Sequence, residues 1–491
     1  MKRREFMRLS AMGSASMLLG AEASLASLAS QQEKPPNLLF VFPDQMRGQA
    51  LGFLGEDPVF TPNLDGFAKE SLVLPQTIAN YPICSPFRAM MLTGKYPHSN
   101  GVVQNCQSNS APFGCELPES VRCWSDVLQD KGYRLGYIGK WHLDSPHEPY
   151  IDCSNNRGAT KWNEWCPPNR RHSFDFWRAY GTYDQHMNPM YWETTAKRDE
   201  FKYVGQWGPE YEADTAIEYL KNENGQYRKA NQPFALVVSM NPPHMPYNQF
   251  PKKYLDAYEG KTAKQLLVRG NVELNGETNM SKLALNQTKN YFAMVTGVDD
   301  QFGRILQALK DSGLENNTIV VFMSDHGNCL GAHDQVSKNN HFEESLRVPF
   351  LIRWPGKIKP RQDDLLLSVP DLFPTLMELM GQQDAIPADV QGSSHAQLFL
   401  TGKGKRPSSQ LYLKTSPAQP AYGKRGARTH RYKLVIDQQP DQAKQTILID
   451  LQNDPYELKN IAEANPKIVA KLFQEELRPW LKKAKDPWKN Y

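Results

Sequence analysis

Short apolar segments alternate with stretches of helical periodicity over roughly residues 37 to 369. The apolar segments are six or seven residues long, which is typical of buried strands; they cover 37–42, 134–139, 234–240, 318–323 and 348–353. Between them, apolar residues recur every three or four positions and predict helices at 61–71, 123–131, 211–222, 286–311 and 372–380. Alternating strands and helices indicate an α/β domain with a mostly parallel central sheet flanked by helices.

The pattern changes after about residue 405. Three strand-like segments predict an antiparallel sheet and a helical pattern follows them; the strands are at 410–414, 431–436 and 445–450, and the helix is at 467–483. No flexible linker separates these elements from the preceding ones, so we expect a smaller C-terminal subdomain over 406–491 that packs on the domain formed by 31–405. Two stretches without clear periodicity, 141–210 and 241–285, predict long loops of the kind that build binding sites.

The first 30 residues differ from the rest of the chain. Four basic residues, Lys2, Arg3, Arg4 and Arg8, precede a weakly apolar stretch of small residues that ends near Ala29. This arrangement resembles a bacterial twin-arginine export signal, which is removed on export. A retained membrane anchor is the alternative, but serine and glycine interrupt the apolar run of about 20 residues that a membrane span needs. We therefore expect a protein that is exported to the periplasm or secreted, without stable membrane insertion.

Composition and charge exclude some classes of protein and of binding site. The 491 residues are 40% hydrophobic and 22% charged, with a formal net charge of +4, as in ordinary globular proteins that fold in water. No long basic run concentrates this charge, so nucleic-acid binding is not expected. The seven cysteines lack the spacing of a zinc site. Five of them lie in one loop-rich region where an exported protein can form disulfides, with the pairing left open: Cys106, Cys115, Cys123, Cys153 and Cys166.

Polar side chains follow four of the predicted strands. Ligands bind outside the carboxyl ends of the strands in open α/β sheets, so we expect these side chains to converge on one crevice. Taken singly, each is equally compatible with a helix cap, a turn or a packed histidine, whereas four such strand ends together favour a binding site. In chain order, the residues are Asp44 and Gln45, then Lys140 and His142, then His244, and finally Asp325 and His326.

The residue types in this crevice suit a metal ion and a tetrahedral anion. Carboxylate and amide oxygens are the ligands that Ca²⁺ prefers, and His326 can add a ring nitrogen. Lys140 and Lys338 cannot ligate a cation but can pair with an oxyanion, although a solvated position is the alternative for Lys338. The crevice therefore fits a sulfate or phosphate ester that is held between a metal ion and lysines.

Cys84 begins a segment that combines a helix start with a known signature. Pro86 fits the first turn of a helix, which places Cys84 at the positive end of the helix dipole. The pattern Cys84-x-Pro86-x-Arg88, followed by Leu92-Thr93-Gly94, resembles the signature of type I sulfatases, in which the cysteine is oxidised to formylglycine. Four further segments resemble the family in the family's order, so that the resemblance covers about residues 35–465: 132–142, 324–349, 428–434 and 448–455.

The resemblance implies a fold and two cofactors. The fold is the alkaline-phosphatase-like α/β fold, with a smaller C-terminal subdomain. A separate maturing enzyme converts Cys84 to formylglycine, whose hydrate has two hydroxyls: one attacks sulfur and the other later expels sulfate. One Ca²⁺ is held by the modified Cys84 together with Asp44, Gln45, Asp325 and His326.

The resemblance also implies a role for each remaining site residue. Arg88 holds the diol, His142 orients or deprotonates it, and His244 protonates the leaving alcohol. Lys140 and Lys338 bind the sulfate oxygens. The chain departs from the most frequent family residues, which are aspartate, serine, a hydroxyl residue and asparagine, at four positions: Gln45, Phe87, Leu135 and His326.

These motifs leave the substrate open. Four tryptophans and the polar segment 183–188 offer stacking faces and hydrogen-bonding groups that suit sugars, although core packing would explain the tryptophans equally well: Trp162, Trp165, Trp177 and Trp192. We expect a carbohydrate sulfate, such as algal ulvan, carrageenan or fucan, or a glycosaminoglycan. The alternatives are a phosphodiesterase or phosphonate monoester hydrolase on the same scaffold and, if Cys84 stays unmodified, a non-catalytic protein that binds sulfated glycans.

Overall fold

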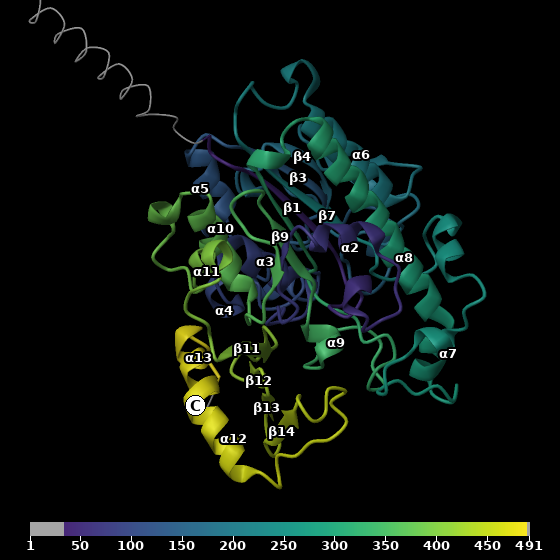
Figure 1. Ribbon diagram of the computed structural model, residues 1–491, viewed down its shortest axis with the longest axis vertical. Coiled ribbons are helices and arrows are strands. Elements are labelled where there is room, and N and C mark those ends of the chain that lie inside the picture. Colours follow the sequence, from purple (N-terminus) through teal and green to yellow (C-terminus); the bar gives the residue numbers. More distant parts are fainter. Residues whose placement is uncertain (1–33, 489–491) are drawn as a thin grey trace, which may run out of the picture. The chain divides into compact units, whose positions relative to one another are not determined.

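A ten-stranded sheet forms the centre of the computed structural model, which describes residues 34–488 (Figure 1). The strand order is β10-β2-β9-β8-β1-β7-β3-β4-β5-β6. The sheet is mostly parallel, as predicted, because its central strands all run in one direction. These strands are β8 (Thr318–Met323), β1 (Asn37–Pro43), β7 (Phe234–Met240), β3 (Arg134–Lys140) and β4 (Phe176–Tyr180).

The edges of the sheet contain the antiparallel pairs. On one side, β9 (Phe350–Arg353) runs antiparallel to β8 and to β2 (Leu72–Val73), and β10 (Arg361–Gln362) ends the sheet. On the other side, β5 (Met190–Glu193) and β6 (Lys202–Tyr203) follow β4. Strands β4 to β6 lie in the stretch 141–210, where the sequence predicted loops. That prediction is wrong in part, because β4 and β5 are aromatic strands buried on both faces and lack the alternation that marks a half-buried strand.

Helices cover both faces of the sheet, because alternate residues of each strand point to opposite faces. Leu38 and Phe40 of β1 contribute to one core cluster, whereas Leu39 and Val41 contribute to the other. All five predicted helices are confirmed. The first core contains α3 (Cys84–Thr93), α5 (Trp124–Asp130), α10 (Leu372–Leu379) and α11 (Ala396–Thr401), and the second contains α2 (Pro62–Ala68), α6 (Gly208–Lys221) and α8 (Asn279–Asp311).

Helix α8 begins earlier than the sequence pattern predicted. The prediction placed its start at residue 286, but the helix begins at Asn279, where the side chain of Thr278 accepts a hydrogen bond from the backbone nitrogen of Ser281. This N-cap satisfies a backbone donor that the first turn would leave unpaired. Three further α-helices near the central sheet are one turn long: α4 (Pro97–Asn100), α7 (Ala263–Leu266) and α9 (Glu343–Leu346).

A four-stranded antiparallel sheet follows in the order β11-β12-β13-β14. Its strands are β11 (Ser409–Lys414), β12 (Gly423–Thr429), β13 (Tyr432–Gln438) and β14 (Gln445–Asp450). Strand β12 was missed, because its sequence is mainly glycine and basic residues. The predicted terminal helix is confirmed as α12 (Pro466–Leu472) and α13 (Arg478–Lys483), joined by a π-helical turn. The boundary at 405/406 stays a prediction, since the chain from Pro36 onward forms one compact unit.

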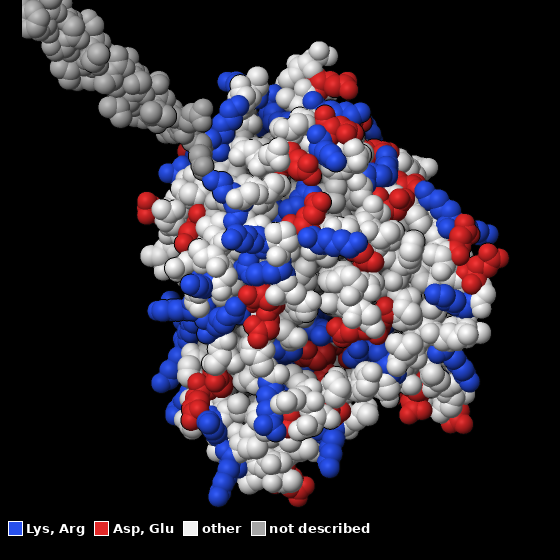
Figure 2. All heavy atoms as spheres, in the orientation of Figure 1, with Lys and Arg blue, Asp and Glu red and all other residues white. Residues whose placement is uncertain are grey.

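The structure also bears on the predictions about disulfides, surface charge and membrane insertion. All seven cysteines are buried and unpaired, so the disulfides that the sequence allowed are not formed. Lysines and arginines are interspersed with acidic residues over the face shown in Figure 2. Within residues 34–488, no helix is both long enough and apolar enough to span a membrane. The predicted export signal at 1–30 lies outside the described residues.

Candidate active site

The carboxyl ends of neighbouring strands meet at one edge of the central sheet. Pro43 of β1 lies beside Met240 of β7, and Gly139 of β3 lies beside Ser239. Residues that follow these strands therefore emerge at the same level, where ligands bind in open α/β sheets. The backbone nitrogen of Gln45 accordingly donates a hydrogen bond to Asp325 Oδ1 at 3.0 Å, although 280 positions separate the two residues.

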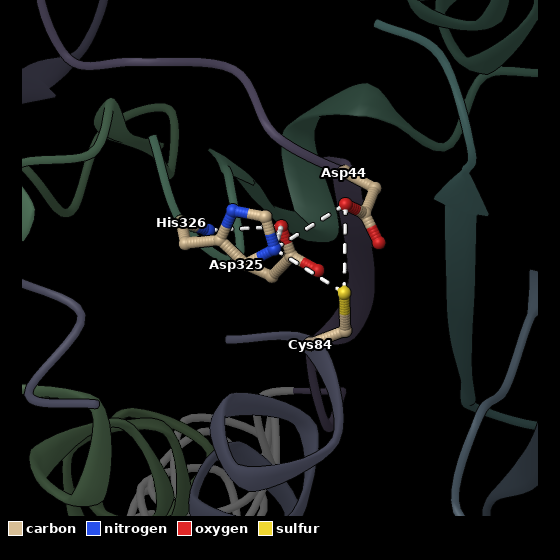
Figure 3. A group of neighbouring side chains, drawn as sticks. All are labelled: Asp44, Cys84, Asp325 and His326. Carbon is tan, nitrogen blue, oxygen red and sulfur yellow. Dashed lines mark hydrogen bonds and ion pairs between the residues drawn. The ribbon is translucent and has the colours of Figure 1, made fainter. Parts of the chain in front are cut away.

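Asp44, Cys84, Asp325 and His326 form a buried cluster at this edge (Figure 3). One ligand atom from each lies within 4.8 Å of all the others. Cys84 Sγ is 3.3 Å from His326 Nε2 and 3.8 Å from Asp44 Oδ1. Cys84 is the first residue of α3, as Pro86 predicted, so the positive end of the helix dipole faces the cluster.

The Cys84 thiol is acidic in this setting. Burial and the Asp44 carboxylate raise its pKa, but the nearby positive groups of Lys140, Lys338 and His326 outweigh them and bring the pKa to about 5. Lys140 Nζ is 3.9 Å from the sulfur. A thiolate is therefore favoured at neutral pH, and position 84 is surrounded by groups that stabilise negative charge.

Arg88 joins the two carboxylates of the cluster. Its Nη2 lies 3.1 Å from Asp44 Oδ2 and 3.2 Å from Asp325 Oδ2, and Lys140 Nζ donates to Asp44 Oδ2 at 2.7 Å. Burial raises the pKa of Asp44, but the surrounding positive groups, Lys140 first among them, hold it well below its usual range. The pKa of Asp325 is raised to about 6 by burial and by the charge of Asp44. Two fully buried carboxylates thus lie close together, and a further positive charge between them would stabilise both.

The donor set fits a divalent cation. His326 Nδ1 lies 3.0 Å from the Gly327 carbonyl, which accepts the Nδ1 hydrogen, so loss of the Nε2 proton leaves a lone pair that faces the cluster, as in metal-binding histidines. The amide oxygen of Gln45 accepts from Lys338 Nζ at 2.7 Å, which leaves its second lone pair for another partner. Two carboxylates and an amide oxygen are ligands that Ca²⁺ favours, and an imidazole nitrogen completes the set.

Comparisons with known proteins decide the family. Residues 36–382 match the sequence profile of the sulfatase family, and residues 331–484 match that of the N-sulphoglucosamine sulphohydrolase C-terminal region. The chain belongs to the sulfatase family. An endo-4-O-sulfatase of Bacteroides thetaiotaomicron is 39% identical over 97% of this sulfatase and 98% of its own length. An ulvan-active sulfatase of Formosa agariphila is 32% identical over 88% of this sulfatase and 78% of its own length.

Solved structures agree with this assignment. A putative sulfatase from Bacteroides fragilis superposes with a TM-score of 0.89 at 48% identity, covering 94% of this sulfatase and 98% of that chain. The expected fold is thereby confirmed. A phosphonate monoester hydrolase of Agrobacterium radiobacter shares the fold with a TM-score of 0.65, but at 22% identity it shows no more than the fold.

Two histidines of the sulfatase border the cluster. His142 is buried, and its Nε2 donates to the Cys106 carbonyl at 3.2 Å, whereas its Nδ1 has no hydrogen-bonding partner among the described residues. Burial and the neighbouring Lys140 hold the pKa of His142 well below its usual value, so this ring is neutral at pH 7. His244 Nδ1 lies 2.8 Å from the Met245 carbonyl and 3.4 Å from Asp184 Oδ1. Burial, Lys338 and Lys140 lower the pKa of His244.

All ten predicted site residues lie in or beside the cluster, but the sequence missed residues that support them. Asn241 Oδ1 accepts from Lys140 Nζ at 3.1 Å, and the Tyr247 hydroxyl accepts from Gln45 Nε2 at 2.9 Å. Asn241 directly follows β7, so its position after a strand could have indicated it. Tyr247 lies within the loop after β7, where the sequence gives no such signal.

The structure also separates residues that the sequence had grouped with the substrate. Trp177 and Trp192 are almost wholly buried and pack in aromatic clusters, which supports the core role for both. Trp162 is partly exposed, and its ring lies 6.3 Å from that of His142, which keeps it as a stacking candidate. His333, which lies in the segment 324–349 that resembles the family, stacks on Phe342 and bonds Asn271, which supports a structural role for this histidine in its loop.

Proposed function

We propose that this sulfatase removes sulfate from a carbohydrate, with formylglycine at position 84 and one Ca²⁺ as its cofactors. The proximity of Cys84 Sγ to the buried carboxylates of Asp44 and Asp325, at the N-terminus of a helix, is the observation that carries the proposal. A sugar substrate is supported by the names of three relatives, an endo-4-O-sulfatase, an ulvan-active sulfatase and an N-acetylglucosamine-6-O-sulfatase.

The cofactors and the chain have separate tasks. Formylglycine, once hydrated, would supply the nucleophilic hydroxyl at position 84. Ca²⁺, held by Asp44, Gln45, Asp325 and His326, would withdraw electron density from the sulfate oxygens. Lys140 and Lys338 would bind the sulfate oxygens beside the metal ion, because both ammonium groups contact metal-ligand residues and cannot themselves ligate a cation. Arg88 orients Asp44 and Asp325 and leaves its Nε without a partner among the described residues.

Proton transfer falls to the two histidines. The unpartnered Nδ1 of neutral His142 suits the acceptance of a proton from the nucleophile. His244 has the opposite task of protonating the leaving alcohol. Burial and the positive charges of Lys338 and Lys140 lower its pKa. The sulfate ester carries one negative charge, which would partly offset those two charges and so raise that pKa when the substrate binds.

Burial of the signature segment dictates when it can be modified. Every residue of α3 is buried, and the Cys84 sulfur lies inside the cluster. A maturing enzyme therefore reaches Cys84 only before the chain has folded. If the predicted export signal at 1–30 carries a folded protein, conversion precedes export, and the exported sulfatase arrives in its active form.

Mass spectrometry and sulfate release test the proposal together. In protein made in a host with a maturing enzyme, the tryptic peptide 70–88 should carry formylglycine in place of Cys84, and the protein should release sulfate from sulfated oligosaccharides. The matched control is Cys84→Ala, which should release none. A fully unmodified peptide together with glycan binding but no turnover would instead favour a binding protein. Faster turnover of phosphate or phosphonate esters than of matched sulfate esters would favour the hydrolases of the alternative class.

A further inference from the structure

A cavity of about 370 Å³ lies beside the C-terminal sheet, within the lower range of ligand pockets, which begins near 300 Å³. One wall consists of residues at the ends of β11, β12 and β13, and Gln104 contributes from the N-terminal part of the chain. None of the residues to which the proposed mechanism assigns a task lines it. A ligand in this cavity would therefore not contact the residues that carry out the chemical step.

The sheet places a row of three charged side chains along this cavity. In the strand register, Lys414 of β11 lies directly opposite Lys424 of β12, which lies directly opposite Asp437 of β13. Tyr412 and Val435 lie two residues before Lys414 and Asp437 and so point to the same face of the sheet. There they pack against Ile78 and Leu346, which cover that part of the face. The cavity opens where this packing ends, and the charged row faces it.

The row contains one positive charge in excess. Lys424 Nζ pairs with Asp437 Oδ2 at 3.6 Å, whereas Lys414 forms no ion pair within residues 34–488. Like charges directly opposite each other in a sheet are destabilising. Burial and the charge of Lys424 accordingly lower the pKa of Lys414. An anion in the cavity would remove this repulsion, and Thr415, Ser416 and Gln419 supply further hydrogen-bonding groups.

Both walls of the cavity connect to the start of α3, where Cys84 lies. The Tyr81 hydroxyl, three residues before Cys84, donates to the Thr415 carbonyl at 2.9 Å. On the other wall, Gln104 precedes Asn105, whose Oδ1 accepts from the backbone nitrogen of Ser85 at 3.1 Å. The cavity is therefore held at a constant position relative to the cluster, as a second subsite for one extended ligand requires.

We propose that this cavity is an anion subsite, which holds a carboxylate or a second sulfate on a sugar near the one that loses its sulfate. The inference rests on the proposed carbohydrate sulfatase function and adds that the substrate is polyanionic. Lys414 is the specificity-determining residue, Lys424 supports it, and Asp437 keeps the charge of the row at a single excess.

Two substrates of different length separate the subsite from the catalytic cluster. The small substrate is 4-nitrophenyl sulfate, which has no second anion, and the long one is a chondroitin 4-sulfate tetrasaccharide. In Lys414→Ala, kcat/KM for the tetrasaccharide should fall at least about 10-fold, mainly through KM, because the variant loses a hydrogen bond between two charged groups. Hydrolysis of the small ester should stay within about 2-fold of the wild type and so report an intact fold. Lys459→Ala, an exposed lysine elsewhere, is the matched control and should match the wild type on both.

Each outcome of this comparison bears on the subsite. Equal turnover of the tetrasaccharide by Lys414→Ala and the wild type would overturn it, as would an equal loss on both substrates. If the wild type hydrolyses neither substrate, the proposed function fails on its own, and the subsite is then tested by calorimetric binding of the tetrasaccharide. Equal affinity of Cys84→Ala and Cys84→Ala/Lys414→Ala would overturn it in that case.

A carboxyl-reduced tetrasaccharide identifies the bound anion. If the carboxylate occupies the cavity, its reduction should lower kcat/KM of the wild type as much as Lys414→Ala does. Reduction of the substrate combined with Lys414→Ala should then lower kcat/KM no further than either change alone. If a second sulfate occupies it, the loss in Lys414→Ala should persist after reduction. Both results support an anion subsite and differ only in which group fills it.

Discussion

Glu212 is a buried carboxyl whose ionisation should control how the stability of this sulfatase depends on pH. It belongs to α6, is fully buried, and lies beneath the strand that carries Lys140. Its Oε1 accepts from the Tyr191 hydroxyl at 2.9 Å, and its Oε2 has no partner among the described residues. Burial raises its pKa from 4.5 to about 8, against the smaller opposing effect of the Tyr191 hydrogen bond.

The sign and size of the effect follow from this pKa. Between pH 4.5 and 8 the unfolded chain has released the proton while the folded protein still holds it, so the free energy of unfolding falls as pH rises through this window. One pKa unit corresponds to about 1.4 kcal/mol, which gives a total of about 5 kcal/mol from this single group. The stability that Glu212 contributes is fully present below its unfolded pKa and is lost above about pH 8.

Glu212→Gln removes the ionisation and keeps the shape. Its urea midpoint at pH 8.5 should exceed that of the wild type, and the difference should shrink toward pH 5, because the unfolded wild-type chain then also begins to hold the proton and no longer gains by releasing it. Glu218→Gln is the matched control, since Glu218 lies on the same helix but is half-exposed beside Arg178; it should follow the wild-type pH dependence. Parallel curves for Glu212→Gln and the wild type between pH 5 and 8.5 would refute the reasoning.

Three further predictions test the site and its support. His244→Ala should lower kcat about 10²–10⁴-fold on sugar sulfates and much less on 4-nitrophenyl sulfate, whose leaving group needs no proton; equal losses on both, measured by released sulfate, would argue against an acid role. Chelation should abolish activity and lower the thermal midpoint of the wild type, with Ca²⁺ restoring both, whereas Asp44→Ala should show no thermal shift on chelation; a wild type unaffected by chelation would contradict the metal site. Arg425→Ala should lose about 3–5 kcal/mol in urea unfolding, because Arg425 and Asp486 form a buried two-point ion pair at 2.7 and 3.0 Å; a loss under 1 kcal/mol would show that the pair is not structural.

Hydrophobic periodicity was sufficient to predict the helices that bury one face and the strands that form a continuous apolar run. It identified β1, β3, β7 and β8 and five helices that cover them, α2, α5, α6, α8 and α10, because their burial follows directly from local residue spacing. It failed at β4 and β12. The aromatic residues of β4 read as loop stacking residues, and the glycines and basic residues of β12 become strand only because β11 and β13 pair with it on both sides.

Residue type and motif order were enough to indicate the chemistry of this protein. A cysteine at a helix start, carboxylates after strands and nearby lysines restricted the ligand to a metal ion and an oxyanion before any contact was known. Contacts between distant segments depended on the tertiary structure, because strand order and register decide which side chains meet. They brought Cys84 within 3.3 Å of His326 across 242 positions, buried Trp177 in the core, and aligned Lys414 with Lys424 beside an open cavity.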